Sequence, residues 1–237
     1  SDVCSSDLRD FNHGGTRRWA SEQVGGDALI VMTQDAIPAN AETFANLISE
    51  LQLEPLNGVA YGRQLPHPGA GVLGAQSRHF NYPAASRTKR LDDAAQLGIK
   101  TCFSSDSFSV YRRSALSAVG GFPQDVIGSE DAYVAARMLL AGFAVRYAAD
   151  AEVYHSHNLT PSQQFARNRA VGFFLETHAD DLMQASEIGE GGRLVRSVSS
   201  QLLREGNFGE LVAFGVDCCA RLLGNRAGRR AARIERS

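Results

Sequence analysis

Short apolar runs alternate with helical patterns along the first 160 residues of the chain. The run from Ala28 to Met32 is rich in branched apolar residues and predicts a strand over 27–33. Proline suits the first turn of a helix, so we expect Pro38 to open a helix over 39–52. Strands that alternate with helices predict an α/β domain built on a sheet. The other elements expected here are strands 57–63, 107–112 and 143–154, helices 113–119 and 129–141, and a loop rich in glycine and proline over 64–90.

The pattern becomes helical throughout after residue 160, where apolar residues recur three and four positions apart. We therefore expect a sheet domain over 9–160 and a helical region over 161–237. Glycine-containing segments are expected to separate the helices of this second part. These helices cover 161–184, 192–205 and 208–223, with breaks at Glu190-Gly191-Gly192 and Glu205-Gly206-Asn207.

The composition fits a globular chain with one sizeable core. Of its 237 residues 43% are hydrophobic and 21% are charged, and the net charge of −2 argues against a general nucleic-acid binder. The apolar run from Leu211 to Val216 is cut short by Asp217, far below the roughly 20 residues that a membrane-spanning helix needs. The four cysteines show no CxxC pair and no spacing typical of a disulfide framework. We therefore expect a cytoplasmic protein that binds no nucleic acid.

Two acids and two histidines flank one predicted helix–strand unit. Glu130 and Asp131 begin the helix, where unpaired N–H groups and the positive end of the helix dipole keep carboxylates ionised. His155 and His157 follow the end of the strand. Carboxylates and imidazoles are the groups that act as bases or bind metals. An ordinary interpretation stays open, in which Ser129 caps the helix, the acids complement its dipole and the histidines are structural.

A further candidate, Asp35, comes directly after the predicted strand 27–33. In open α/β sheets the carboxyl ends of the strands form the ligand crevice. A carboxylate at that edge suits a divalent metal ion that bridges the phosphates of a diphosphate. The motif Gln34-Asp35-Ala36 is short, so its meaning depends on the other segments of the chain.

Eight short segments stand in a fixed order along the chain. They are Phe11 to Arg17, Thr33 to Pro38, Ser109 to Arg113, Gly120 to Pro123, Ser129 to Asp131, Val153 to Asn158, Arg167 to Phe174 and Leu222 to Gly228. In this order they resemble the family 2 glycosyltransferases of the GT-A fold, and within them the rhamnosyltransferase-like enzymes of bacterial surface polysaccharides. The resemblance implies an α/β GT-A sheet domain with a C-terminal helical appendage.

The resemblance also implies a reaction. A sugar, L-rhamnose from dTDP-rhamnose, would move to a saccharide or lipid-linked acceptor in O-antigen or cell-wall biosynthesis, by a single displacement that inverts the anomeric carbon. Asp131 is implied to be the general base, which takes the proton of the attacking acceptor hydroxyl. Glu130 is implied to bind the acceptor or to orient Asp131, and the two acids can exchange roles. Asp106 is implied to line the acceptor side, with capping of a turn as an equal alternative.

A divalent metal ion, Mg²⁺ or Mn²⁺, is implied to neutralise the diphosphate of the donor. Asp35 is implied to be its first ligand. Gln34 takes the place of the first acid in the family's metal-binding motif and would face the substrate, which leaves the site one carboxylate short. His157 is implied to be a second ligand or a hydrogen-bond donor to the diphosphate, with His155 as the alternative.

The segment before the first predicted strand is implied to form a loop that faces the diphosphate. His13 belongs to this loop, and Gly14 with Gly15 would let the backbone approach a phosphate closely. The guanidinium of Arg17 is charged and can donate paired hydrogen bonds to phosphate oxygens. A simple turn before a helix is the alternative.

The N-terminal residues Ser1 to Leu8 resemble the translation of a sequencing-adapter oligonucleotide. We expect residues 1–8 to be a scar and Arg9 to begin the natural sequence. On this interpretation the chain lacks the first strands of the fold, which hold the nucleotide base in the family. A natural polar tail is the alternative.

The C-terminal segment is rich in arginine, with Leu222, Leu223 and Ile234 among the charges. Such a segment can rest peripherally on the anionic inner face of the plasma membrane, where each basic residue adds about 1 kcal/mol. This contact would suit a lipid-linked acceptor. A frayed, solvated tail is equally open. The arginines are Arg221, Arg226, Arg229, Arg230, Arg233 and Arg236.

Two other classes of protein remain open on the sequence alone. A nucleotidyltransferase that makes sugar nucleotides shares the α/β outline, but the chain shows no glycine-rich loop with a lysine after a first strand. A non-catalytic sugar-binding domain, or a degenerate transferase fragment, would need exposed aromatic residues, and the only tryptophan is Trp19. Replacement of Asp131 by Asn separates the classes, because only a transferase loses turnover while it keeps donor binding.

Overall fold

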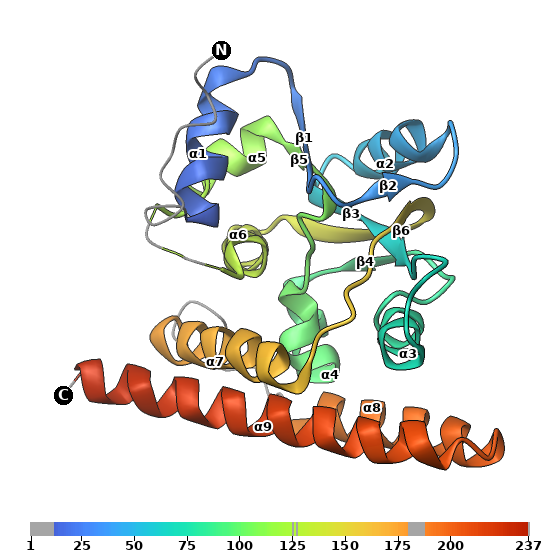
Figure 1. Ribbon diagram of the computed structural model, residues 1–237. Coiled ribbons are helices and arrows are strands. Elements are labelled where there is room, and N and C mark those ends of the chain that lie inside the picture. Colours follow the sequence, from blue (N-terminus) through green and yellow to red (C-terminus); the bar gives the residue numbers. More distant parts are fainter. Residues whose placement is uncertain (1–11, 125, 127, 180–187, 237) are drawn as a thin grey trace.

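A mixed β-sheet with helices on both faces forms the centre of the protein (Figure 1). The computed structural model describes residues 12–124, 126, 128–179 and 188–236, so the expected scar lies outside the described residues. Within them the sheet has six strands in the order β1-β5-β3-β6-β2, and β4 also pairs with β6. Only β3 and β6 run parallel among these pairs. The strands are β1 Ala28–Met32, β2 Ile37–Pro38, β3 Asn57–Leu65, β4 Arg87–Lys89, β5 Phe108–Arg112 and β6 Ala144–Tyr154.

Alternating side chains of the sheet supply two apolar cores. In β5, Phe108 and Val110 belong to the core under α2, whereas Tyr111 belongs to the core under α5 and α6, as the two-residue period of a strand requires. All three side chains are fully buried, and each buried side chain of this size contributes roughly 2 kcal/mol. The sheet is thereby fixed between two helical layers. These helices are α2 Thr43–Gln52, α5 Arg113–Ala118 and α6 Glu130–Leu140.

The first described helix, α1 (His13–Gln23), packs against the chain that precedes α6. A side chain at Gly14 would place its Cβ 2.2 Å from the carbonyl oxygen of Pro123, and the Gly14 N–H donates to the carbonyl of Val126 at 3.3 Å. The glycine is therefore required by this close approach between two parts of the protein. The expectation of a diphosphate-facing loop is wrong from His13 on, because these residues are helical.

Three long helices follow the sheet. Figure 1 shows α9 along one edge of the molecule, with α7 between it and the sheet. The backbones of α7 and α9 touch, since a Cβ at Gly228 would lie 2.0 Å from the carbonyl oxygen of Arg169, and one at Gly172 would lie 2.2 Å from that of Asn225. The helices are α7 Pro161–Thr177, α8 Ile188–Arg204 and α9 Phe208–Arg236.

Two expectations for the sheet domain are wrong. Pro38 does not open a helix, because Ile37–Pro38 pair with β6 as the short outer strand β2, where the missing N–H is tolerated, and α2 begins at Thr43. The expected loop over 64–90 contains a helix and a strand. The helical segments in and after it are α3 Val72–Asn81, α4 Ala94–Leu97 and the 3-10 turns Leu91–Asp93 and Gly98–Cys102.

The C-terminal helices also differ from their expected bounds. The predicted break at Glu190-Gly191-Gly192 lies inside α8, because a glycine costs a helix only about 1 kcal/mol. The predicted helix 208–223 continues to Arg236, so the basic segment is helical rather than a frayed tail. The predicted helix 161–184 ends at Thr177, and residues 180–187 lie outside the described part. None of the described helices is both long and apolar enough to cross a membrane.

Candidate functional site

A cleft of about 1820 Å³ lies between the sheet domain and the helices α7 and α9. It brings together residues from α1, from the turn after β1, from the start of α6 and from the chain after β6. Gly14 and Asp106 are not among the residues that line it. The sequence-predicted residues that do line it are His13, Arg17, Gln34, Asp35, Glu130, Asp131, His155 and His157.

Arg17 lies at the centre of a buried acid cluster. Its Nε is 3.2 Å from Oδ2 of Asp106, and its guanidinium also contacts the carboxylate of Glu130. Glu130 is 4% exposed and Asp106 is 1% exposed. Buried charges are tolerated when they are paired, as these are. Arg17 is therefore engaged by two acids of the protein, and the phosphate-binding role expected for it has to compete with these contacts.

Asp106 is buried beneath the cleft and forms hydrogen bonds with three neighbouring residues. Its Oδ1 accepts hydrogen bonds from the hydroxyls of Ser109 at 2.6 Å and Tyr111 at 2.7 Å. Its backbone N–H donates to Oδ2 of Asp131 at 3.3 Å. Because Asp106 is buried and does not line the cleft, the direct contact with an acceptor that the resemblance implied does not fit the structure.

Asp131 faces the cleft from the first turn of α6. Two backbone N–H groups fix its carboxylate, that of Ala132 at 2.8 Å from Oδ1 and that of Asp106 at Oδ2. Burial, and then the negative charge of Asp106, raise the pKa of Asp131 to about 6. Asp131 is therefore a stronger base than an ordinary aspartate and is still mostly ionised at neutral pH.

The residue before α6 has an unusual backbone conformation. Ser129 has φ 65° and ψ 22°, in the left-handed region, and its side chain makes no capping hydrogen bond. A residue other than glycine costs about 1 kcal/mol in this conformation. The expectation that Ser129 simply caps the helix is therefore wrong, and the strained turn leads directly into Glu130 and Asp131.

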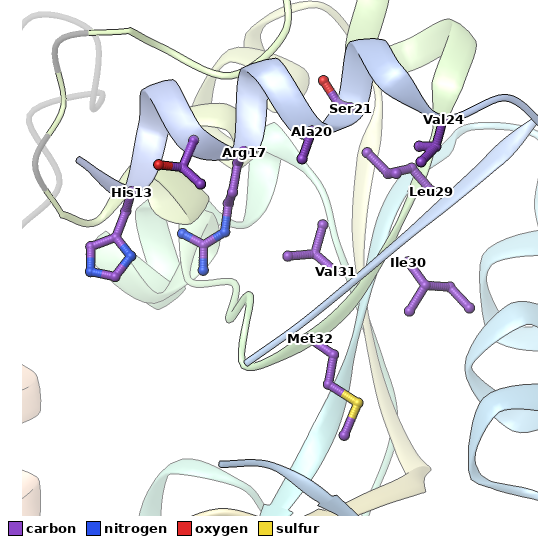
Figure 2. A pocket seen from close by; sticks show the side chains of 10 residues that line it. His13, Arg17, Ala20, Ser21, Val24, Leu29, Ile30, Val31 and Met32 are labelled. Atoms are coloured by element: carbon purple, nitrogen blue, oxygen red, sulfur yellow. The ribbon is translucent and has the colours of Figure 1, made fainter. Parts of the chain in front are cut away.

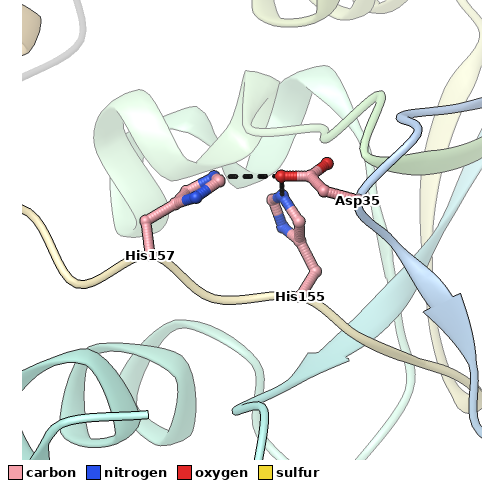
Figure 3. A group of neighbouring side chains, drawn as sticks. All are labelled: Asp35, His155 and His157. Carbon is pink, nitrogen blue, oxygen red and sulfur yellow. Dashed lines mark ion pairs between the residues drawn. The ribbon is translucent and has the colours of Figure 1, made fainter. Parts of the chain in front are cut away.

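Asp35, His155 and His157 form a second cluster in the cleft (Figure 3). Oδ2 of Asp35 lies 3.4 Å from Nε2 of His155 and 3.7 Å from Nε2 of His157. The side chains of Asp35 and His157 are 47% and 37% exposed, whereas that of His155 is 7% exposed. Partial burial would raise the pKa of Asp35, but hydrogen bonding and its other neighbours together outweigh burial, so this pKa is lowered.

A chain of hydrogen bonds determines which nitrogen of His155 carries the proton. Oε1 of Gln64 accepts from Nη1 of Arg78 at 2.6 Å, and Nε2 of Gln64 donates to the Ser105 hydroxyl at 2.7 Å. Nδ1 of His155 lies 2.9 Å from the same Oε1. Because a guanidinium can only donate, this oxygen is an acceptor and Nδ1 must be the donor. Burial, and then Arg78, lower the pKa of His155 to about 4, so the ring is neutral and Nε2 presents a lone pair.

The second cluster fits a divalent cation. The lone pair of His155 Nε2 and a carboxylate oxygen of Asp35 face each other at 3.4 Å with no proton between them. A cation bound between these acceptors turns their repulsion into attraction. The ligand atoms of all three residues lie within 4.8 Å of one another. A metal-bound histidine whose other nitrogen donates to a fixed acceptor is the usual arrangement at metal sites, and Gln64 supplies that acceptor.

A smaller cavity of about 400 Å³ runs between α1 and β1 (Figure 2). Figure 2 shows apolar side chains of β1, among them Val31 and Met32, on one side and His13 and Arg17 of α1 on the other. His13 and Arg17 line both this cavity and the cleft, so they stand where the two spaces meet. Burial, and then Arg17, lower the pKa of His13, which favours the neutral ring.

Sequence reasoning missed three polar residues of the site. Gln64 is 2% exposed at the end of β3, and the signal that identified Asp35, a polar residue after a buried strand, applies to it equally. Arg78 is on α3, inside the segment expected to be a loop, and no sequence signal connects it to the histidines. Arg167 of α7 lines the cleft, and its charge contributes to the lowered pKa values of His155 and His157.

Comparison with known proteins places these residues in a family context. No protein-family model matches the chain. The O-antigen chain rhamnosyltransferase RfbN of Salmonella typhimurium is 42% identical over 202 residues, which cover 84% of this chain and 63% of that protein. The chain is a homologue of O-antigen chain rhamnosyltransferases. A second one, WbaN of Salmonella anatum, is 42% identical over 195 residues, covering 81% of this chain and 61% of that protein, so this chain spans less than two thirds of either relative.

A solved structure confirms the fold. The mannosyltransferase PcManGT from Pyrobaculum calidifontis, in complex with GDP-Man and Mn²⁺, matches with a TM-score of 0.56 at 15% identity. The match covers 94% of this chain and 66% of that chain. The α/β fold of GT-A type that the sequence predicts is therefore confirmed.

Proposed function

We propose that this chain is the catalytic part of a glycosyltransferase that moves L-rhamnose from dTDP-rhamnose to a saccharide or lipid-linked acceptor, with inversion in a single displacement. The observation that supports the proposal is the cleft itself, which joins a hydrogen-bonded acid cluster around Asp131 to a cluster at Asp35 and His155 whose ligand atoms suit a cation. The names of the relatives support rhamnose as the sugar. The dTDP part of the donor rests on the family resemblance.

In this proposal Asp131 is the general base. Its two oxygens are held by backbone N–H groups, which orient the carboxylate toward the hydroxyl that it deprotonates. Glu130 contacts Arg17 and is almost fully buried, which favours the orienting role over acceptor binding. Asp106 is a positioning residue, because its N–H binds Asp131 and its charge raises the pKa of that acid.

The second cluster would hold the divalent ion. Asp35, His155 and His157 would be its protein ligands, and the ion would neutralise the charge of the donor's diphosphate. Imidazole ligands suit transition metals, whereas Mg²⁺ prefers oxygen ligands alone, so this donor set favours Mn²⁺ over Mg²⁺. Because Arg17 is engaged by two acids, Arg167 is the better candidate for direct contact with phosphate oxygens. Gln34, which is exposed beside Asp35, would contact the donor.

The setting of the reaction is part of the proposal. We place the transfer in the cytoplasm, with a peripheral position on the inner face of the plasma membrane and no nucleic-acid partner. The net charge of −2 supports the absence of a nucleic-acid partner.

A screen of donor hydrolysis tests the proposed function. The chain, and a version extended upstream by its own genomic reading frame, are incubated with dTDP-, UDP- and GDP-sugars in Mn²⁺, in Mg²⁺ and in chelator. We expect turnover of dTDP-rhamnose that depends on the metal and is faster with Mn²⁺. Turnover of a different donor would replace the sugar and keep the reaction. Donor binding without turnover in both versions would favour the non-catalytic sugar-binding alternative, and no binding in either would reject the proposal.

A further inference from the structure

The outward side of α9 is a surface that the proposed reaction does not use. On its inward side, Gly224 allows the helix to touch the carbonyl of Phe165, and Gly228 allows contact with that of Arg169. The residues on the opposite side recur mostly three or four positions apart, which places them on one face of the helix. We define the α9 outer face as Phe208, Val212, Val216, Leu222, Leu223, Arg226, Arg230 and Ile234, all of which are exposed.

The first half of the α9 outer face is apolar. Val212 is 70% exposed and Phe208 is 66% exposed, which are high values for large apolar side chains. Val216, Leu222 and Leu223 continue the strip and are 49%, 52% and 56% exposed. Single exposed apolar residues are common on protein surfaces, but a contiguous strip along one helix face indicates a binding surface.

The second half of the α9 outer face is positively charged. Arg226 and Arg230 follow Leu222 at intervals of four residues, and Ile234, 63% exposed, comes four residues later. Neither of these two arginines has an acidic partner among the described residues. Their neighbours differ in this respect, because Arg229 and Arg233 both pair with Glu176.

The acids of α9 lie on other sides of the helix. Glu210 and Asp217 line the cleft on the inward side. Glu235 comes nine positions after Arg226, which is half a turn around the helix. The α9 outer face therefore combines apolar side chains with positive charge, although the chain as a whole has a net charge of −2.

We propose that the α9 outer face docks on the surface of an anionic lipid bilayer. The apolar strip would enter the boundary between headgroups and acyl chains, while Arg226 and Arg230 bind lipid phosphates. A helix that is apolar and basic on one face and packed on the other is suited to lie in such an interface. A second copy of this chain is a poorer partner, because it brings the same positive charge to the contact.

Docking would also position the cleft. The inward side of α9 lines the cleft with Asp217, Arg221 and Asn225. Because the outward side of the same helix touches the membrane, the cleft would lie about one helix diameter, roughly 10 Å, from the headgroups. A lipid-linked acceptor would then reach the cleft from the bilayer. This last step rests on the proposed glycosyl transfer, whereas the docking does not.

Vesicle binding of the chain tests the docking. Vesicles of phosphatidylcholine, with and without about one third phosphatidylglycerol, are sedimented with the chain at low and at physiological salt. We expect binding to the anionic vesicles only, and weaker binding as salt rises. Arg226→Gln with Arg230→Gln should weaken this binding roughly 30-fold, since each basic residue near an anionic surface is worth about 1 kcal/mol. The matched control, Arg87→Gln with Arg137→Gln, removes two exposed arginines from other surfaces and should bind like the parent.

A second variant keeps the test independent of charge and of folding. Phe208→Ser with Val212→Ser removes two side chains that are already exposed, so the fold should survive, and binding should fall roughly tenfold or more. The proposal is overturned if the parent ignores anionic vesicles, or if both double variants bind as well as the parent. A concentration-dependent dimer that these substitutions abolish, seen by light scattering without vesicles, would instead assign the face to a second copy. None of these readouts depends on sugar transfer, so the docking and the proposed glycosyl transfer can fail separately, although the peripheral position proposed above depends on the docking.

Discussion

The two side-chain clusters at the cleft differ in the groups that the protein places against their carboxylates. In the acid cluster, Asp106 accepts two hydroxyl hydrogen bonds and pairs with Arg17, and Asp131 accepts two backbone N–H groups. In the second cluster, the lone pair of His155 Nε2 faces a carboxylate oxygen of Asp35 at 3.4 Å. The acid cluster is thus held together by contacts within the protein, although Nη1 of Arg17 and Oδ2 of Asp106 are buried without a hydrogen bond to any described residue. The second cluster instead brings two acceptors together, an arrangement that a bound cation would stabilise.

This difference suggests that the two clusters have different roles in the proposed reaction. Fixed hydrogen bonds and neighbouring charges set the basicity of Asp131, so changes there should alter turnover and its pH dependence. In the proposal the second cluster holds the divalent ion, so changes at Asp35, or at residues behind the histidines, should alter metal affinity first.

The largest effect is expected from Asp131→Asn in the complete enzyme. The amide keeps the shape of the side chain but cannot take a proton, so turnover should fall roughly a thousandfold. Metal affinity and donor binding, measured by calorimetry, should stay at the parent level. Asp150→Asn, which changes an exposed aspartate on β6, is the matched control and should leave turnover unchanged. Turnover within a few-fold of the parent would remove Asp131 as the base.

Asp35→Asn should have the largest effect on the second cluster. The substitution removes the only carboxylate among the three proposed ligands, so the affinity for Mn²⁺, titrated without donor, should fall roughly a hundredfold. The pH dependence of the remaining turnover at saturating Mn²⁺ should be unchanged, because the acid cluster is intact. If the Asp35→Asn variant binds Mn²⁺ as tightly as the parent does, the cluster is not the metal site.

The positions of the residues of the second cluster could be predicted from the sequence, because they depend on local patterns. Asp35 and the two histidines lie within three residues of the ends of β1 and β6. Both strands have clear apolar patterns, and their ends lie within about a residue of their expected positions. Residues at the carboxyl ends of strands gather at one edge of a sheet. The ordered segments that resemble a family added the expected fold, which the structural match confirms. The roles of these residues stay predictions.

The contacts of the acid cluster were not accessible, because they depend on packing between distant segments. Gly14 suggested a phosphate-binding loop, but its lack of a side chain serves the contact with Pro123, more than a hundred residues away in the chain. The same packing turns Arg17 toward Asp106 and Glu130. A glycine followed by an arginine looks the same in the sequence whether the two residues form a phosphate-binding loop or pack against distant segments of the chain.

Gln64, which sequence reasoning missed, accepts a hydrogen bond from the ring of His155. Gln64→Leu leaves the Nδ1–H of His155 without its acceptor, which frees the ring to rotate or change tautomer, and Mn²⁺ affinity should fall roughly 10- to 100-fold. Gln64→Glu keeps an acceptor at the same place and should bind Mn²⁺ more tightly than the leucine variant. Equal affinities of the leucine variant and the parent would show that the hydrogen bond does not orient His155. Turnover at saturating Mn²⁺ should depend on pH as in the parent.

The smallest effect is expected in the pH profile of turnover, which reports on the acid cluster alone when Mn²⁺ is kept saturating. A base with a pKa of about 6 works as a carboxylate, so kcat/KM should rise with pH, reach half of its plateau near pH 6, and be about tenfold lower at pH 5. Asp106→Asn removes the negative charge beside Asp131 and should shift the rise of kcat/KM to lower pH. The folded-state pKa of Asp131 is raised above its unfolded value of 3.8, so the parent should lose stability as pH rises from about 4 through about 6, with no further loss from this group at higher pH, and the Asp106→Asn variant should lose less. If kcat/KM rises at the same pH in both proteins, Asp106 does not set the pKa of Asp131, and its hydrogen bonds serve the fold.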